Sequence, residues 1–364
     1  MTKEYYNIRN DIDRYPDAWC YAAIGGRAAG KTYSTLKDCL ECQRDFIFVK
    51  RTIEDVDIIC SGSGRIGSKT NEYGIDLSPF KAINRDTGSD VRAYSIKSGI
   101  GGFWHANEEG KATGVPVGMI LGLNAVSKYK GFELASSGME QWLIFDEFIP
   151  NIYDRVSRRE GNQLLDLYMT VSRDREKRGL QPLKLILLAN ATSISNPTMQ
   201  ILEIVDDVSM MQARGESEKM LTDRGIFIHL LEGVQTDVAS DDQPAIMKAM
   251  AGTAWAEMSF GNTFAYNDFS KVDKVNLKNY CPVCRIIHKR HMIYVYQSDQ
   301  GYYLTSSRHD RGPVYDLDVE SDQYKLYDDY AYDIKMACID GQAYFQSYTM
   351  YDLIMNYRKI YNIN

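Results

Sequence analysis

The sequence predicts an α/β fold with a central parallel sheet, because three apolar runs each end at a polar motif. The runs lie at residues 18–24, 142–145 and 183–189, and each has the near-continuous apolar character of a buried strand. A glycine-rich turn follows the first run, an acidic pair follows the second, and an asparagine ends the third. Ligands of open α/β sheets bind outside the carboxyl ends of the strands, so the fold class also predicts where these motifs meet.

The segment GGRAAGKT, residues 25–32, fits the phosphate-binding pattern G-x-x-x-x-G-K-[ST] without a gap. Glycines let backbone N–H groups approach phosphate oxygens, the lysine reaches the β- and γ-phosphates, and the threonine hydroxyl binds Mg²⁺. Apolar residues at helical spacing follow, so the phosphates are expected at a helix N-terminus. Arg27 is either a second cation near the γ-phosphate or a solvated loop arginine. The predicted ATP-binding residues are Gly25, Gly26, Arg27, Ala28, Ala29, Gly30, Lys31 and Thr32.

The acidic pair in QWLIFDEFIP limits which phosphoryl reactions the site can catalyse. Asp146 is expected to bind Mg²⁺ together with Thr32, and Glu147 to polarise the attacking water as a general base. A small-molecule kinase uses the hydroxyl of its acceptor and does not need a glutamate that positions water. Glu147 therefore favours ATP hydrolysis over phosphoryl transfer.

Two further strands are expected, at residues 44–51 and 225–232. The first lies between the two motifs in the sequence, and an extra strand of this kind is typical of P-loop ATPases with a catalytic glutamate, the ASCE type. Asn190 is expected to sense the γ-phosphate or to orient the water, although asparagine also commonly caps turns.

Residues 161–182 predict a helix whose last turns carry the cations Arg173, Arg175, Lys177 and Arg178. Cations at a helix C-terminus are favoured by the macrodipole. Alternatively, one arginine reaches the ATP of a neighbouring subunit, where such a residue adds about 10³ to 10⁵ in rate. The pattern alone does not choose between these roles or among the four cations.

The composition is that of an ordinary globular chain without a membrane partner. Hydrophobic residues make up 44% and charged residues 25%, and no apolar run is long enough to span a bilayer. The polar N-terminus has no signal-peptide core, and seven scattered cysteines favour a reducing cytoplasmic compartment. The net charge of −7 excludes a general nucleic-acid coat, so any such contact is expected to be local.

The motifs GGRAAGKT, LIFDEFIP, SRDRE, LLANATSISNP and AWAEMSFGN occur in this order. Together they resemble the DNA-packaging ATPases of phi29-like small tailed bacteriophages, which are terminase-like encapsidation proteins. The resemblance implies an ATP-driven motor that uses Mg²⁺ to move double-stranded DNA into a preformed capsid in the host cytoplasm. It also implies a ring of identical subunits, five in number, docked on the capsid portal. Whether a structural packaging RNA takes part stays open.

The resemblance assigns roles to particular residues. Lys31, Thr32, Asp146 and Glu147 match the family's Walker residues, Arg173 matches its trans-acting arginine, and Arg175 is the second choice. It also implies an ATPase domain at 1–233, a linker at 234–262 and a small α+β domain at 263–364. That last domain is expected to look like a vestigial RNase H-like nuclease, and because no acidic trio stands out, we predict no nuclease activity.

Residues 55–135 form a long insertion in which the resemblance is weakest, expected to be either a lid over the nucleotide or a DNA-contacting element. Lys50 and Arg51, at the end of the second strand, are the candidates for gripping DNA phosphates.

The segment CPVCRIIHKRHM contains four metal-type residues, Cys281, Cys284, His288 and His291, but their close spacing and alternation favour a strand over a zinc site. Its basic residues either contact DNA, RNA or the portal, or lie on a solvated strand face.

Two alternatives remain beside the motor. Another ASCE ATPase, such as a helicase or an assembly ATPase, would share the nucleotide motifs, but the further nucleic-acid motifs of helicases are not seen. A non-enzymatic scaffold would need the nucleotide only to lock an interface, and the intact Lys31 and Glu147 argue against it.

Overall fold

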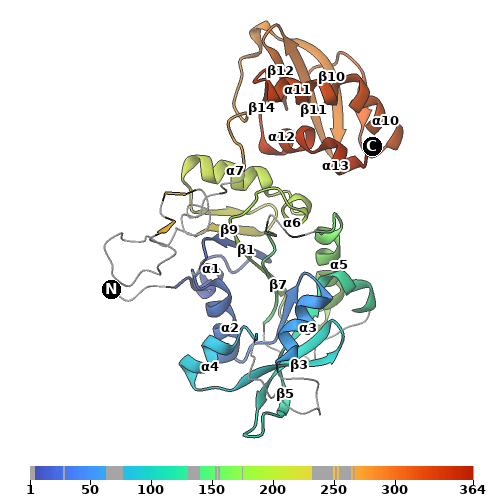
Figure 1. Ribbon diagram of the computed structural model, residues 1–364. Helices are drawn as coiled ribbons and strands as arrows, with labels where there is room; N and C mark the ends of the chain where they lie inside the picture. Colours follow the sequence, from blue (N-terminus) through green and yellow to red (C-terminus); the bar gives the residue numbers. More distant parts are fainter. Residues whose placement is uncertain are drawn as a thin grey trace. The chain divides into compact units, whose positions relative to one another are not determined.

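The computed structural model describes most of the chain, as two compact units (Figure 1). The described residues are 5–27, 29–62, 77–129, 140–151, 154, 156–173, 175–231, 249–250, 252–253, 264 and 267–363. The first unit comprises residues 1–202 and 211–266, and the second comprises 203–210 and 267–364. Ala28, most of the expected linker at 234–262 and the AWAEMSFGN motif lie outside the described residues.

The first unit is a mixed α/β structure built on a nine-stranded sheet of order β3-β4-β5-β2-β6-β7-β1-β9-β8. The run from β5 to β9 is parallel throughout, while β3, β4 and β8 are antiparallel additions at the two edges. The strands are β1 (Cys20–Gly25), β2 (Phe46–Lys50), β3 (Val91–Lys97), β4 (Ile100–Ala106), β5 (Ala112–Gly122), β6 (Gln141–Asp146), β7 (Leu183–Asn190), β8 (Glu218–Leu221) and β9 (Ile226–Leu230). The predicted α/β class with a central parallel sheet is confirmed.

The three apolar runs form adjacent central strands. Strands β1, β6 and β7 are buried along nearly their whole length, because central parallel strands are covered on both faces. Their side chains share one core cluster with the surrounding helices, including Tyr21, Trp142 and Leu188. The carboxyl ends of these strands meet at one edge of the sheet, as Gly25 pairs with Asn190 and Asp146 with Leu188.

The strand expected at residues 44–51 is present as β2, and its place in the sheet differs from its place in the sequence. The strand between β1 and β6 in the sheet is β7, whereas β2, which lies between the two motifs in the sequence, pairs with the outer side of β6. Sheet order is set by how far each crossover connection reaches, and this is not encoded in the order of the strands along the chain. Asn190, at the end of β7, is thereby placed between the two nucleotide motifs.

Helices connect the strands of the first unit. They are α1 (Ile8–Arg14), α2 (Lys31–Glu41), α3 (Ile53–Ser61), α4 (Lys81–Thr87), α5 (Glu160–Ser172), α6 (Pro197–Ile201) and α7 (Val205–Arg214), with 3₁₀ turns η1 (Leu123–Tyr129) and η2 (Glu176–Arg178). The start of α3 is fixed by a reciprocal capping box between Thr52 and Asp55. Helix α7 begins in the stretch assigned to the second unit and ends in the first.

The described part of the 55–135 insertion contributes three strands to the sheet. Strand β5 adds to β2 in parallel, and β4 and β3 continue the sheet outward as antiparallel strands. The β2–β5 contact requires a glycine at 118, because a Cβ there would lie 2.3 Å from the Phe46 ring. Residues 63–76 and 130–139 of the insertion lie outside the described residues, and they include the basic Arg65 and Lys69.

The second unit is a five-stranded mixed sheet packed with helices. The sheet order is β13-β10-β11-β12-β14, in which β10, β11 and β12 form an antiparallel meander and the two edge strands are parallel to their neighbours. Its core cluster includes Ile286, Val295, Leu304 and Phe345. The strands are β10 (Cys281–His288), β11 (His291–Ser298), β12 (Gly301–Thr305), β13 (Val314–Asp316) and β14 (Ala343–Phe345). The helical elements are η3 (Leu277–Asn279), α10 (Glu320–Leu326), η4 (Tyr327–Ala331), α11 (Tyr332–Ile339), α12 (Tyr348–Met355) and α13 (Tyr357–Tyr361).

The four metal-type residues of this unit lie along a hairpin. Cys281 is opposite Gln297 at its open end, while His288 pairs with His291 beside the turn. Burial raises the pKa of the Cys284 thiol to about 12, which opposes the thiolate that zinc needs. Among the residues that the structure describes, no three His, Cys, Asp or Glu side chains are grouped to hold a metal ion. The strand interpretation of this segment is confirmed.

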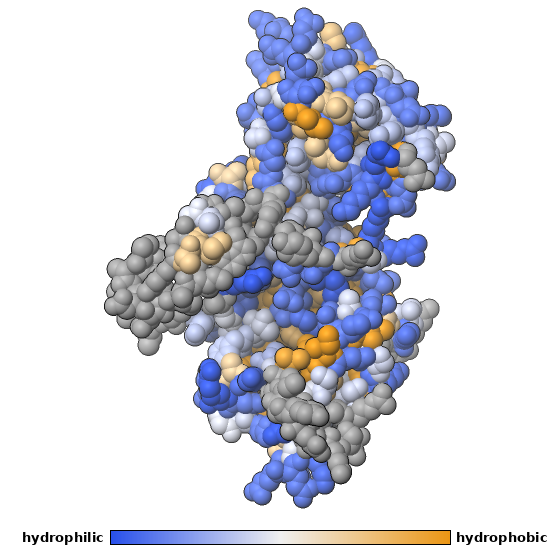
Figure 2. Space-filling model, viewed as in Figure 1, coloured by the Kyte–Doolittle hydropathy of each residue, from blue (hydrophilic) through white to orange (hydrophobic). Residues whose placement is uncertain are grey.

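On the face drawn in Figure 2, most of the coloured residues are hydrophilic, and the hydrophobic ones form small separate areas. Within the described ranges, no helix combines the length and apolar character needed to cross a membrane.

Candidate active site

The phosphate-binding loop joins the end of β1 to the start of α2. Gly30 is the N-cap of α2 and has φ of 80°, a left-handed conformation that favours glycine. Gly25 is required for a different reason, since a Cβ there would lie 2.7 Å from the Cβ of Leu231. Because the N–H groups in the first turn of a helix lack partners within the helix, the start of α2 provides donors for a phosphate.

Lys31 is buried, with 8% of its surface exposed, and it is held inside this loop. Its ammonium group donates to the carbonyl oxygens of Gly25 and Gly26, at 3.1 and 2.8 Å, and to Oδ1 of Asn190 at 3.3 Å. Burial lowers the pKa of Lys31 to about 8, although Asp146 acts in the opposite direction. A triphosphate beside this ammonium would favour its charged form.

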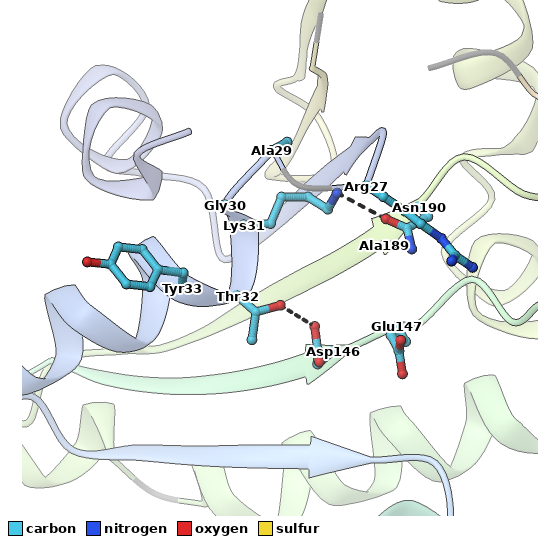
Figure 3. A pocket seen from close by; sticks show the side chains of 10 residues that line it. All are labelled: Arg27, Ala29, Gly30, Lys31, Thr32, Tyr33, Asp146, Glu147, Ala189 and Asn190. Atoms are coloured by element: carbon cyan, nitrogen blue, oxygen red, sulfur yellow. Dashed lines mark hydrogen bonds between the residues drawn. The ribbon is translucent and has the colours of Figure 1, made fainter. Parts of the chain in front are cut away.

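Thr32 and Asp146 meet where a divalent cation is expected. The Thr32 hydroxyl donates to Oδ1 of Asp146 at 2.7 Å, which joins the start of α2 to the end of β6 (Figure 3). A hydroxyl and a carboxylate are hard oxygen donors, and Mg²⁺ typically takes one or two protein oxygens besides phosphate and water. The pair therefore fits the predicted Mg²⁺ site.

Glu147 follows the last residue of β6 in a left-handed conformation, with φ of 57°. Such a conformation is uncommon for a non-glycine residue and often marks a functional site. The side chain is 53% exposed, and its Oε2 accepts a hydrogen bond from Lys50 Nζ at 3.0 Å. The nearby Lys50 ammonium is the main reason that the pKa of Glu147 lies below its ordinary value, with smaller effects from Arg51 and Arg27. Glu147 is thus an ionised carboxylate, as a general base must be.

The structure brings most of the predicted nucleotide residues to one pocket of about 220 Å³. Figure 3 shows that they come from the loop, from the start of α2 and from the ends of β6 and β7. The pocket is lined by Arg27, Ala29, Gly30, Lys31, Thr32, Tyr33, Asp146, Glu147, Ala189 and Asn190. Gly25 and Gly26 contribute through the carbonyl groups that hold Lys31.

Lys50 and Arg51, the residues predicted to grip DNA phosphates, are both engaged with acidic residues and are mostly covered, with 13% and 12% of their side chains exposed. Lys50 donates to both Asp146, at 3.2 Å, and Glu147. Arg51 donates from Nε to Glu160 at 2.6 Å and from a terminal nitrogen to the backbone carbonyl of Glu147 at 2.8 Å. Because β2 is next to β6, a cation at the end of one strand faces carboxylates at the end of the other. The sequence carried a signal for this pairing, namely two adjacent cations at one strand end and two acids at another, but only the sheet order joins them.

The arginine candidates separate into two environments. Helix α5 ends at Ser172, earlier than expected, so all four cations follow the helix. Arg173 is the exposed C-cap residue, with φ of −40° and ψ of 118°, outside the helical region. Arg175 is buried and donates to the carbonyl of Gln181 at 2.9 Å and to the side chain of Gln141. Arg175 therefore stabilises its own subunit, whereas Arg173 has the exposure that a trans-acting arginine needs.

Comparison with known proteins gives matches among solved structures. No protein-family model and no curated protein sequence matches this chain. The viral genome packaging motor assembly of bacteriophage Phi-29 aligns over 97% of this chain and 99% of its own, with a TM-score of 0.63 and 19% identity. The Phi-28 gp11 DNA packaging motor aligns over 99% of this chain and 98% of its own, with a TM-score of 0.59 and 16% identity.

At these identities the likeness establishes the fold, and it extends over nearly the full length of both chains. The chain thus has the fold of the phage DNA-packaging motor subunits, with a phosphate-binding loop and an ionised glutamate at the carboxyl edge of its parallel sheet.

Proposed function

We propose that this protein is the ATP-hydrolysing motor subunit that moves double-stranded viral DNA into a preformed capsid. The observation that carries the proposal is the pocket in which Lys31, Thr32, Asp146 and Glu147 meet, within a fold shared along nearly its whole length with packaging motors. The nucleotide is ATP, and Mg²⁺ bound by Thr32 and Asp146 would neutralise charge on its phosphates.

Residues that line the pocket bind the phosphates and activate the attacking water. Lys31, at the start of α2, binds the β- and γ-phosphates, and Asn190 lies within hydrogen-bond distance of its ammonium group. Glu147 accepts the proton of the attacking water. Its lowered pKa keeps the carboxylate ionised, as this role requires. Arg27 lines the pocket near Glu147 and is the second cation available to the γ-phosphate.

The assembly that fits this chemistry is a homo-oligomeric ring, five copies by family resemblance, docked on the capsid portal in the host cytoplasm. Arg173 reaches the ATP of the adjacent subunit in this arrangement, because it is exposed and follows the end of α5. A structural packaging RNA at the docking site is compatible with the proposal and is not required by it.

For the C-terminal unit we propose an RNase H-like fold that has lost its catalytic acids. The antiparallel meander with a parallel strand beside β10 supports the likeness, while β14 pairs at the opposite edge of the sheet, beside β12. The expected result is that the full chain does not nick supercoiled plasmid DNA with Mg²⁺ or Mn²⁺. Metal-dependent nicking that tracks with the purified protein would overturn this part.

The central test measures ATP hydrolysis by the full chain with and without double-stranded DNA. We expect DNA to stimulate wild type, and both Glu147→Gln and Arg173→Ala to lose at least about 10²-fold in rate. An equal mixture of the two variants should recover part of the activity, because some interfaces then pair an intact Glu147 with a neighbour's intact Arg173. Arg159→Ala, which removes an exposed arginine at the other end of α5, is the matched control.

The outcomes separate the proposal from its alternatives. If Arg173→Ala hydrolyses ATP like wild type, the trans-acting role is wrong. If hydrolysis does not respond to double-stranded DNA, an assembly ATPase replaces the motor. DNA-stimulated hydrolysis that needs no portal-bearing procapsid for DNA movement would favour a helicase.

A further inference from the structure

The pocket has a direction, which predicts where the base of a bound nucleotide lies. Glu147 and Asn190 mark the γ-phosphate end, because the attacking water must be activated there. Figure 3 shows Thr32 and Asp146 in the middle and Tyr33 on the side away from Glu147. A triphosphate that runs from Glu147 across Lys31 and Thr32 therefore leaves the pocket beside Tyr33.

A second aromatic ring lies next to Tyr33 at this end. The rings of Tyr5 and Tyr33 have centroids 6.0 Å apart and planes inclined by 43°. Tyr5 is 52% exposed, and Tyr33 is half-buried, so ring surface remains open beside the pocket. The two side chains come from segments separated in the sequence, and only the fold brings them together.

Both rings are held in place by contacts to the phosphate loop and its surroundings. The Tyr33 hydroxyl donates to Asp86 at 2.9 Å. The N–H of Tyr6, which follows Tyr5, donates to the carbonyl of Ala29 at 3.1 Å. The Tyr5 ring also packs on Gly30, where an added Cβ would lie 2.6 Å from it. The N-terminal segment is therefore attached to the loop that binds the phosphates.

We propose that Tyr5 and Tyr33 form a stacking platform for the base of the bound nucleotide, a proposal that rests on ATP binding in the proposed function. Aromatic faces stack on nucleobases, and alanine substitution of such a ring weakens binding substantially. A platform of two aromatic rings acts on a base by stacking on its face. The rings then contribute to the binding of GTP as well as ATP, because every base has a π-face.

The test compares ATP with inorganic tripolyphosphate, which has the phosphates and lacks the base. Equilibrium binding to the full chain with Mg²⁺ is measured for wild type, Tyr5→Ala, Tyr33→Ala and Tyr33→Phe. Each alanine variant should bind ATP about 5- to 100-fold more weakly and keep its tripolyphosphate affinity within about twofold. Tyr33→Phe loses the bond to Asp86 and keeps the ring, so its ATP affinity should remain near that of wild type.

Retained tripolyphosphate binding also shows that each variant keeps a folded phosphate loop. The proposal is overturned if ATP affinity is unchanged in both alanine variants. It is also overturned if ATP and tripolyphosphate affinities fall equally, since the rings would then only support the loop. Should an alanine variant fail to fold, Tyr5→Leu and Tyr33→Leu replace it with a side chain that fills space without a π-face. If DNA does not stimulate ATP hydrolysis by wild type, the proposed motor function is wrong. The binding measurements would still decide whether Tyr5 and Tyr33 bind the base.

Discussion

The ammonium nitrogen of Lys50 lies 3.0 Å from Oε2 of Glu147 and 3.2 Å from Oδ2 of Asp146. One cation, with 13% of its side chain exposed, thus bridges the predicted general base and the predicted Mg²⁺ ligand. These two carboxylates raise the pKa of Lys50 despite its burial, so its charge persists at neutral pH.

Lys50 is expected to compete with Mg²⁺ for Asp146. Replacing it by methionine, Lys50→Met, removes a positive charge beside the metal site. The Mg²⁺ concentration for half-maximal ATP hydrolysis should therefore fall several-fold, on the order of 1 kcal/mol of removed repulsion. Lys50→Arg keeps the charge and should stay near wild type. A rise in the required Mg²⁺ in Lys50→Met would mean that Lys50 assists metal or phosphate binding.

Arg51 is expected to be structural. It forms an ion pair with Glu160, and the side chains are only 12% and 2% exposed. Arg51→Met should lower the free energy of unfolding by about 3 to 5 kcal/mol, because Glu160 is left buried without its partner. Burial already raises the pKa of Glu160 and Arg51 opposes this, so the loss should be larger at pH 8 than at pH 5, where the carboxyl is more easily protonated.

The double variant Arg51→Met/Glu160→Gln tests this explanation, because it removes the buried charge and should recover most of the lost stability in urea unfolding. If Arg51→Met unfolds like wild type and instead weakens DNA-stimulated hydrolysis, Arg51 contacts DNA and is not structural.

Substitution of Arg175 should lower stability, whereas substitution of Arg173 should lower the rate of ATP hydrolysis. Arg175→Met removes a buried donor to Gln181 and Gln141 and should cost about 2 to 4 kcal/mol of unfolding free energy. Arg173→Met changes an exposed side chain and should stay within about 0.5 kcal/mol of wild type while losing hydrolysis. Urea unfolding and ATPase rates measured on the same preparations check both. Equal stability losses in the two variants would contradict the assignment.

His288 should make the second unit sensitive to acid. Burial, with smaller effects from Lys289 and His291, lowers the pKa of His288 to about 4, and its Nδ1 lies 3.0 Å from the Tyr361 hydroxyl. The unfolded chain has a histidine pKa near 6.5 and so binds the proton first as pH falls. Stability from the neutral ring is therefore present above about pH 6.5 and is lost between about 6.5 and 4, by up to about 3 kcal/mol.

Urea unfolding of wild type and His288→Gln at pH 7 and pH 4.5 measures this effect. The variant lacks the titrating ring, so its stability should fall less over that interval. An equal fall in both proteins would show that other groups, such as paired carboxylates, account for the acid sensitivity.

The sequence by itself determined the local parts of the nucleotide site. The G-x-x-x-x-G-K-[ST] spacing fixed a loop before a helix, and the apolar runs fixed where β1, β6 and β7 end. Because the carboxyl ends of parallel strands meet at one edge of a sheet, Lys31, Thr32, Asp146, Glu147 and Asn190 could be assigned to one pocket without coordinates.

Only the tertiary structure decided which strands are neighbours and which cations are buried. Strand β7 stands between β1 and β6, and β2 lies outside β6, so Lys50 faces Glu147. Arg173 and Arg175 are two positions apart in one basic run, yet one is exposed and the other is buried against Gln141. The contact between the rings of Tyr5 and Tyr33 also depends on tertiary packing. Local spacing dictates a turn or a helix start, whereas partners distant in the chain depend on crossover connections and packing, which no local pattern encodes.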